Sequence, residues 1–216
     1  MKIFESTPWR YDKGIRRITL GRLDKAYDRL TSHIEKGQRV LDLGCGTGIL
    51  TLRAAQKNAN VKGIDINSQM LTIARRRVRD ANLTESVVLS EMGVAELGGE
   101  DSESYDVVMT GLCFSELTED ELRYTLRETK RILKPGGLLL VADEAKAESV
   151  PKRILNSMMR LPLVILTYMV AGTTSRPLDN LREWIEGSGL VIESARLNRM
   201  ENFIELVGRK LGKRVK

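Results

Sequence analysis

Cysteine and histidine are scarce in this sequence of 216 residues, which contains Cys45, Cys113 and a single histidine, His33. Two cysteines cannot form the disulfide framework of a small secreted domain. Together with one histidine they cannot supply the clustered ligands of a zinc or iron–sulfur site, and radical chemistry on a three-cysteine cluster is excluded for the same reason. We therefore expect no metal site, and any cofactor to be organic.

Aromatic residues, proline and long apolar runs are also scarce. Aromatic residues make up 5% of the chain, and there are five prolines. Because no window is rich enough in polar residues to resist burial, the chain is expected to form one globular domain, residues 1–216. The longest mainly apolar stretch, residues 161–171, is shorter than the roughly 18 residues of a membrane-spanning helix, and no basic-then-apolar leader begins the sequence. We expect no membrane span and a cytoplasmic location.

The net charge of +6 is modest and is concentrated in two places. The basic residues concerned are Arg75, Arg76, Arg77, Arg79, Lys210, Lys213, Arg214 and Lys216. One interpretation is a surface for nucleic acid or an anionic membrane. No aromatic side chains interleave with these charges to stack on bases, so a solvated helix face and a solubilising tail are favoured, and nucleic acid is not expected as a partner.

Short β-rich runs alternate with longer amphipathic segments along the chain, which is typical of a parallel sheet with crossover helices. Helices are expected over residues 14–35, 48–57, 68–81, 119–133 and 178–186, and strands over 39–43, 60–65, 86–91, 105–110, 138–142, 190–197 and 203–209. Residues 134–137, Lys-Pro-Gly-Gly, are expected to end the preceding helix, because proline cannot continue it. The last two strands have so short a link that they must be antiparallel neighbours.

The most informative segment is residues 40–48, Val-Leu-Asp-Leu-Gly-Cys-Gly-Thr-Gly, in which an apolar strand leads through three alternating glycines into a helix. Glycine there permits a sharp turn and lets the backbone lie against a ligand. Asp42, two places before the first glycine, would repel a pyrophosphate but suits a ligand with an ammonium group. Asp65, 21 residues after Gly44, can accept both hydrogen bonds of a ribose diol. These features favour S-adenosyl-L-methionine over a dinucleotide as the ligand. They also favour a turn that binds a ligand over one that is needed only for packing.

Residues 40–50 with Asp65, together with Tyr105-Asp106-Val107-Val108 and residues 131–137, resemble the class I methyltransferases. The resemblance covers residues 38–209. Within the class, the chain is similar to the ubiquinone and menaquinone C-methyltransferases, and residues 4–30 resemble the corrinoid-protein-associated methyltransferases. The resemblance implies a doubly wound, Rossmann-like α/β fold whose seven-stranded sheet is mostly parallel with a C-terminal antiparallel hairpin. Its parts would be an N-terminal helical cap (1–36), a cofactor-binding core (38–144), a lid or acceptor segment (145–177), and a helix with the hairpin (178–209).

The resemblance also implies which residues bind the cofactor. The glycine-rich turn would line the methionine portion, Asp65 would bind the ribose, and Ile66 and Met70 would flank the adenine. Many relatives carry an aspartate after the third strand, whereas this sequence has Gly93, so we expect backbone groups there to replace it. The expected cofactor-binding residues are Tyr11, Asp42, Gly44, Cys45, Gly46, Thr47, Gly48, Asp65, Ile66, Met70, Met92, Gly93, Val94, Gly111 and Leu112.

The methyl acceptor should lie beside residues 110–117, which follow the fourth strand, because ligands bind at the carboxyl ends of the strands. These residues lack the Asn/Asp-Pro-Pro-aromatic signature of amino-group methyltransferases, which argues against methylation of an exocyclic base nitrogen. Cys113 is a candidate nucleophile or contact to a soft acceptor, or a small packing residue. Glu116 is a candidate general base, or a solvated residue ahead of the next helix.

We expect methyl transfer to a small, apolar or corrinoid-linked acceptor by in-line displacement. The methionine-rich residues 151–175 suit a bulky apolar acceptor, or else a homodimer interface. The alternatives left open are a nucleic-acid or protein methyltransferase and a non-catalytic adenosylmethionine-binding partner of a corrinoid or membrane protein. A nicotinamide oxidoreductase is a more distant alternative.

Overall fold

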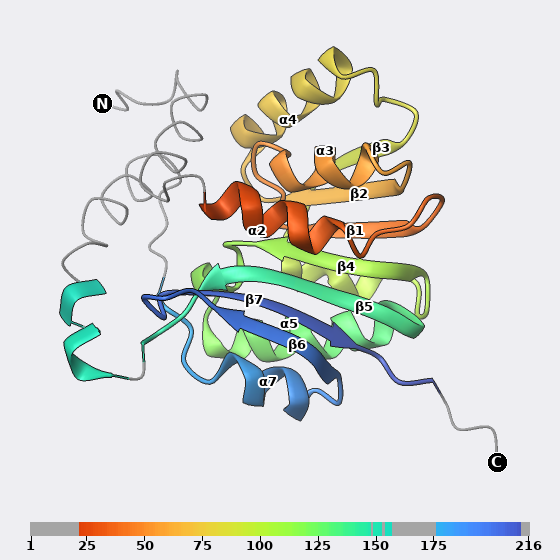
Figure 1. Cartoon of the computed structure of the whole chain (residues 1–216). Coiled ribbons are helices and arrows are strands. Elements are labelled where there is room, and N and C mark those ends of the chain that lie inside the picture. The colour runs from red at the N-terminus through yellow and green to blue at the C-terminus, as the bar shows by residue number, and fades with distance from the viewer. Residues whose placement is uncertain (1–21, 148, 153, 157–175, 213–216) are drawn as a thin grey trace.

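The computed structural model describes residues 22–147, 149–152, 154–156 and 176–212. Seven strands form one sheet in the order β3-β2-β1-β4-β5-β7-β6 (Figure 1). The strands are β1 (Arg39–Leu43), β2 (Asn60–Asp65), β3 (Val87–Glu91), β4 (Tyr105–Gly111), β5 (Leu133–Glu144), β6 (Val191–Leu197) and β7 (Phe203–Arg209). Strands β1 to β5 pair in parallel, whereas β7 is antiparallel to both β5 and β6. The expected fold class is confirmed.

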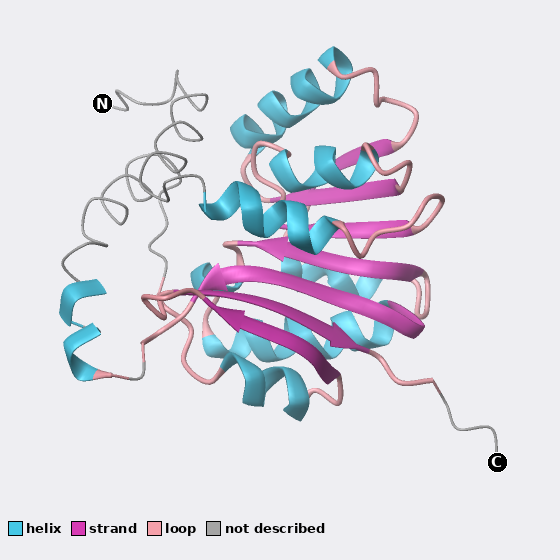
Figure 2. Ribbon diagram, viewed as in Figure 1, coloured by secondary structure: helices cyan, strands magenta, loops and turns pink. Residues whose placement is uncertain are grey.

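Helices cover both faces of this sheet (Figure 2). They are α2 (Arg22–Thr31), α3 (Ile49–Ala55), α4 (Ser68–Asp80), α5 (Glu119–Ile132) and α7 (Leu181–Gly187), with short 3₁₀ turns η1 (Val94–Gly99) and η2 (Phe114–Glu116). Side chains of α2, α3 and α4, such as Leu30, Leu50 and Val78, form one buried cluster with the sheet. Leu126 of α5 and Ile185 of α7 belong to the cluster on the other face.

The chain direction around β1 determines where a ligand can bind. Strand β2 lies on one side of β1 and β4 on the other, and Leu43 at the end of β1 aligns with Ile64 and Thr110. The strand order therefore reverses between β1 and β4, which is the switch point where open α/β sheets bind ligands at the carboxyl ends of their strands. The turns that follow β1, β2 and β4 all meet there.

Strand β5 is longer than the sequence pattern indicates. We expected residues 134–137 to form a turn before a strand over 138–142, but β5 begins at Leu133 and includes them. Leu133 pairs with Tyr105, and the register then shifts so that Val107 aligns with Leu138. Residues 135–137, Pro-Gly-Gly, form an irregular stretch within β5. Pairing with β4 continues on either side of this stretch.

Two predicted helix boundaries also differ. The helix expected over residues 14–35 is described only from Arg22, where α2 begins, and it ends at Thr31; residues 1–21 lie outside the described part. The helix expected from residue 178 begins at Leu181, because Asn180 has a left-handed backbone (φ 54°). Leu178 instead forms a bridge with Ala145.

That bridge brings together the two ends of the expected acceptor segment, residues 145–177. The N–H of Lys146 donates to the carbonyl of Leu178 (3.0 Å), and the N–H of Leu178 donates to the carbonyl of Glu144 (3.0 Å). Most of the segment between them lies outside the described residues, as do the methionines on which the prediction of an apolar cover depends. In the described part of the chain, no helix is long and apolar enough to cross a membrane.

Candidate functional site

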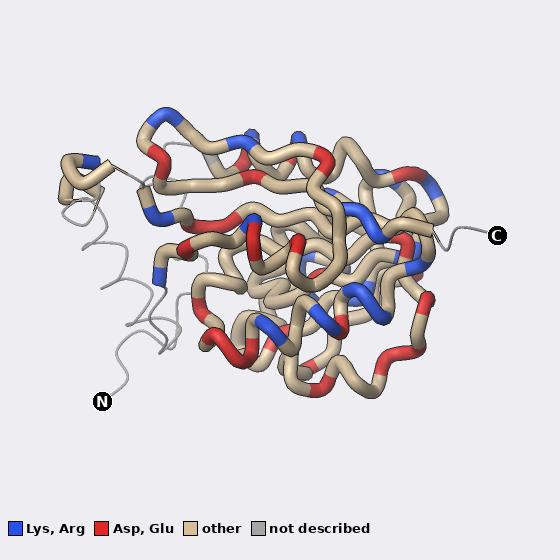
Figure 3. The backbone as a smooth tube through the Cα atoms, turned by 90° about the horizontal axis from the view of Figure 1, so that it is seen from below, with Lys and Arg blue, Asp and Glu red and all other residues tan. Residues whose placement is uncertain are grey.

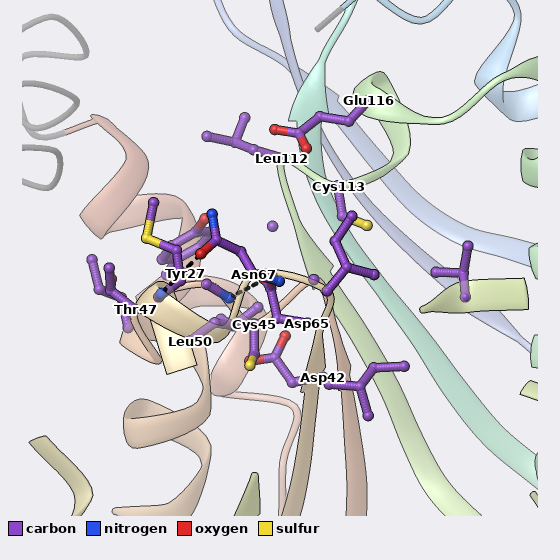
Figure 4. Close-up of a pocket in the computed structure, with 18 of the residues that line it drawn as sticks. Tyr27, Asp42, Cys45, Thr47, Leu50, Asp65, Asn67, Leu112, Cys113 and Glu116 are labelled. Atoms are coloured by element: carbon purple, nitrogen blue, oxygen red, sulfur yellow. Dashed lines mark hydrogen bonds between the residues drawn. The ribbon is translucent and has the colours of Figure 1, made fainter. Parts of the chain in front are cut away.

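A cavity of about 1130 Å³ opens at the carboxyl ends of β1, β2 and β4 (Figure 4). The predicted site residues that line it are Asp42, Gly44, Cys45, Gly46, Thr47, Asp65, Ile66, Met70, Met92, Gly93, Val94, Gly111, Leu112, Cys113 and Glu116. Tyr11 lies outside the described residues. Gly48 is described but is not part of the cavity wall. The turns that follow β1, β2 and β4 thus surround one cavity.

Two glycines of the glycine-rich turn make different packing contacts. At Gly44, which has φ +65°, an added Cβ would lie 2.7 Å from both Cβ and Sγ of Cys113, so this position must stay small for the β1 and β4 turns to pack. Gly48 precedes α3 and faces α4, where an added Cβ would lie 3.1 Å from the Cβ of Ala74. Gly48 therefore packs two helices together, which explains why it does not line the cavity as we expected.

Asp42 is a buried carboxyl group at the floor of the cavity, with 1% of its surface exposed. Its Oδ2 accepts a hydrogen bond from the hydroxyl of Thr51 in α3 (2.5 Å). Its Oδ1 is buried and has no hydrogen-bond partner among the described residues. Burial raises the pKa of Asp42 to about 7. The hydrogen bond from Thr51 acts in the opposite direction and lowers the pKa, whereas the negative charge of Asp65 raises it further. A cationic ligand above it would supply the missing stabilisation.

Asp65 ends β2 beside the same turn. Its Oδ2 accepts a hydrogen bond from the N–H of Gly46 (2.7 Å), and its Oδ1 accepts one from the N–H of Asn67 (2.8 Å). Burial raises the pKa of Asp65 although both backbone hydrogen bonds favour the charged form. Each carboxylate oxygen has a further lone pair, so Asp65 can still accept hydrogen bonds from a diol while its orientation is fixed by the backbone.

Ile66 and the turn after β3 form an apolar wall. Ile66 is 71% exposed although it is a large apolar residue, and its Cγ2 lies 3.2 Å from the position of a Cβ on Gly93. The N–H of Met92 donates to the carbonyl of Asp65 (3.1 Å), and that of Gly93 donates to the carboxylate of Glu96 (2.9 Å). Two of the three backbone donors that we expected to serve a base are thus already used within the protein. The N–H of Val94, at the start of η1, is the remaining candidate.

The turn after β4 forms the opposite side of the cavity, where Figure 4 shows Leu112, Cys113 and Glu116 across from Asp42. Leu112 has a left-handed backbone (φ 63°), and its N–H donates to the carbonyl of Ala142 (2.9 Å). Burial raises the pKa of the Cys113 thiol well above its usual value, and nearby carboxylates, first that of Glu116, add to the shift. A neutral thiol packed under Gly44 is a poor nucleophile, so the packing interpretation of Cys113 is favoured.

Several residues of the cavity wall were not expected from the sequence. They are Tyr27 and Arg53, which belong to α2 and α3, Asn67, which precedes α4, and Arg77, which belongs to α4. Asn67 could have been found, because an asparagine directly before a helix is a common N-cap, and its side chain accepts from the N–H groups of Gln69 and Met70. Tyr27 carried only the signal of an apolar helix face, which indicates burial but not what the ring contacts.

The arginine cluster of α4 is bound to its own chain at several points. Arg75 donates to the carbonyl of Leu89 (3.4 Å), Arg76 pairs with Asp80 (3.7 Å), and Arg77 donates to the carbonyl of Thr47 (3.1 Å). Basic and acidic residues are interspersed over the traced backbone in Figure 3. These contacts support the interpretation of a solvated helix face over that of a nucleic-acid surface.

The raised pKa values make a prediction about stability. A carboxyl group whose pKa is raised on folding stabilises the native state only while it is protonated, so this stability is lost as the pH rises toward the folded pKa. Asp42 and the buried Asp143 of β5, each with a pKa raised from 3.8 to about 7 by burial, should therefore lower the free energy of unfolding as the pH rises from about 4 to about 7. Urea unfolding across this range should show the fall, and Asp42→Asn should make it shallower. A fall as steep in the variant as in the parent would contradict this assignment.

Comparison with known proteins agrees with the resemblance to methyltransferases. The family model described as "Methyltransferase domain" matches residues 40–137. The chain is 32% identical over 151 residues to the ubiquinone/menaquinone biosynthesis C-methyltransferase UbiE of Vibrio vulnificus, an alignment covering 67% of this chain and 56% of that protein. The chain therefore spans little more than half the length of this curated relative.

Solved structures share the fold. A geranyl diphosphate C-methyltransferase from Streptomyces coelicolor A3(2) superposes with a TM-score of 0.67 at 12% identity, over 87% of this chain and 78% of its own. A SAM-dependent methyltransferase from Methanosarcina mazei gives a TM-score of 0.66 at 20% identity, over 83% of this chain and 95% of its own. At these identities the likeness shows the fold alone, whereas the family match includes the turn around Asp42 and also Asp65. The predicted family is confirmed: the chain belongs to the class I methyltransferases, whose cofactor is S-adenosyl-L-methionine.

Proposed function

We propose that this chain binds S-adenosyl-L-methionine in the cavity and transfers its methyl group to a small apolar acceptor by in-line displacement. The observation that carries the proposal is Asp42, a buried carboxyl group whose Oδ1 has no partner among the described residues and which lines the same cavity as Asp65. A ligand with an ammonium and a sulfonium group favours the charged forms of both acids. A dinucleotide would instead add the negative charge of its pyrophosphate to theirs.

Different residues of the cavity would bind different parts of this cofactor. The wall at Gly46 has open space where a side chain would be, so backbone there can lie against the methionine portion. Asp65 would accept the ribose hydroxyls, and the exposed face of Ile66 would cover the adenine. When bound, the cofactor supplies an electrophilic methyl group, and the chain has to hold it, orient the acceptor and exclude water. Contacts from Tyr11 remain a prediction of the sequence.

The remaining cavity wall suits an apolar acceptor. Its apolar side chains are Leu23, Ile49, Leu50, Leu52, Leu112 and Leu117. The cavity of about 1130 Å³ is larger than the roughly 300–1,000 Å³ typical of small-molecule sites, which leaves room for a second molecule beside the cofactor. The Vibrio relative is named as a C-methyltransferase, which supports a carbon acceptor. Glu116 would then accept the proton that leaves this carbon after the new carbon–carbon bond forms.

Other parts of the proposal rest on the sequence. A corrinoid-linked acceptor depends on residues 4–30, most of which lie outside the described part, and a homodimer has no described interface residues to support it. Residues 145–177 as the acceptor segment are supported only by their two ends, one of which brings the N–H of Arg176 to the carbonyl of Ser115 (2.6 Å) beside the cavity. A cytoplasmic location is supported by the free thiols of Cys45 and Cys113.

Calorimetry tests the first half of the proposal. We expect S-adenosyl-L-methionine and S-adenosyl-L-homocysteine to bind with measurable heat, while NAD neither binds nor raises the melting temperature. The second half is tested with labelled S-adenosyl-L-methionine and cell extract, fractionated into lipid, protein and nucleic acid. Label in the small-molecule or lipid fraction would support the acceptor class. Absence of heat for both adenosyl ligands would refute the cofactor, and label in nucleic acid alone would refute the acceptor class.

A further inference from the structure

Tyr27 lies against the end of β4 although it belongs to α2, about 80 residues earlier in the chain. A Cβ on Gly111 would be 2.2 Å from the hydroxyl oxygen of Tyr27 and 2.7 Å from its Cζ. Both residues line the cavity, and Tyr27 is otherwise buried. The phenol therefore occupies the space that a side chain on the last residue of β4 would fill if this residue were not glycine.

Helix α2 is held firmly in the orientation that places this phenol. The Arg53 guanidinium of α3 donates to the carboxylates of Asp24 (2.6 Å) and Asp28 (2.9 Å), which flank Tyr27 on α2. The same guanidinium lies 5.8 Å from the centre of the Tyr27 ring. At its other end α2 is tied to β7, because Arg29 donates two hydrogen bonds to Glu205. Contacts on both sides of Tyr27 thus limit movement of its ring.

The hydroxyl oxygen of Tyr27 lies at the end of β4, beside Gly111. The end of β4 is the side of the cavity opposite Asp42, where the transferable methyl group must face the acceptor if the cofactor lies across the glycine-rich turn. A phenol that donates its proton still has lone pairs on its oxygen, so it can accept from a polarised C–H group whatever its own donor contact is. The methyl group of a sulfonium is polarised in this way, and the methyl group is absent from the demethylated product.

We infer that Tyr27 is a further residue of the methyl-transfer site, whose phenol oxygen contacts the sulfonium methyl group in place of a side chain from β4. This inference rests on the proposed function. According to this inference, Tyr27 of α2 contacts the reacting atoms directly. Gly111 leaves the room that this contact needs. Arg53 acts through Tyr27 as a positioning residue, because its contacts with α2 hold the ring in place.

The test compares the affinities for S-adenosyl-L-methionine and S-adenosyl-L-homocysteine in Tyr27→Phe. The phenol oxygen should matter only for the ligand that carries the methyl group, so we expect an affinity loss of about fivefold for the first ligand, of the size of a weak C–H···O contact, and no loss beyond about twofold for the second. Gly111→Ala, which would displace the hydroxyl, should show the same selective loss. Equal losses for both ligands, or none, in Tyr27→Phe would overturn the inference.

Tyr105→Phe is the matched control. Tyr105 is buried, its hydroxyl donates to Glu100 (2.7 Å), and it does not line the cavity. The same loss of a hydroxyl there should change the melting temperature without changing the ratio of the two affinities. If the parent protein binds neither ligand, the proposed function itself fails. If the parent binds both and the ratio in Tyr27→Phe is unchanged, only the assignment of Tyr27 fails.

Discussion

Asp42→Asn should weaken the binding of S-adenosyl-L-methionine by about a hundredfold at pH 8. The amide keeps the shape of the side chain and can still accept from Thr51, but it removes a buried charge opposite a cationic ligand, a change that typically costs about 2–5 kcal/mol. Isothermal titration calorimetry gives the dissociation constant. Asp101→Asn, an exposed change of the same charge away from the cavity, is the control and should bind as the parent does.

The pH dependence of binding gives this prediction a second measurement. Because the pKa of Asp42 is raised to about 7, the parent should bind the cofactor more tightly as the pH rises from 6 to 8. At pH 6 binding should release a proton, which calorimetry in two buffers of different ionisation enthalpy detects. Asp42→Asn should lose both effects while its free energy of unfolding at pH 8 increases. An unchanged affinity in this variant would refute the charge complementarity on which the proposed function depends.

Gly44→Ala should destabilise the fold by about 2–4 kcal/mol and abolish measurable cofactor binding. Two effects add at this position. The left-handed backbone (φ +65°) disfavours alanine, and the new Cβ would lie 2.7 Å from the Cβ of Cys113. Rotation of the Cys113 side chain cannot relieve this overlap, because the Cβ is attached directly to the backbone. Urea unfolding and calorimetry would measure the two losses.

Two other glycines separate these effects. Gly37 has a left-handed backbone (φ +81°) with open space and lies away from the cavity, so Gly37→Ala should cost only about 1–2 kcal/mol and leave binding unchanged. Gly46→Ala also meets open space within the protein, but it faces the cavity, so it should weaken binding more than stability. The double variant Gly44→Ala/Cys113→Gly should recover part of the lost stability. If Gly44→Ala were no less stable than Gly37→Ala, the contact between the β1 and β4 turns would not matter as we propose.

Local sequence patterns predicted most of the fold. Strands β1, β2 and β7 begin and end where the alternation of apolar residues places them, and α5 begins at Glu119 after a capping box of Thr118 and Glu121. The glycine-rich turn with Asp42 and Asp65 was likewise readable, since it lies within one strand-turn-helix unit and the strand that follows. Such features depend on residues close together in the chain, so their periodicity and spacing can be read directly.

The sequence by itself determined the α/β class, the mostly parallel sheet with its antiparallel C-terminal pair, and the two acids, Asp42 and Asp65, that line the cavity. Only the tertiary structure decided that Tyr27 fills the space above Gly111, that Gly48 packs α3 on α4, and that β5 extends back to Leu133. The physical reason is that these features depend on contacts between segments far apart in the chain. Burial works in the same way: Asp42 reads as an ordinary acid in sequence, and its pKa of about 7 arises only when the sheet and α3 exclude water around it.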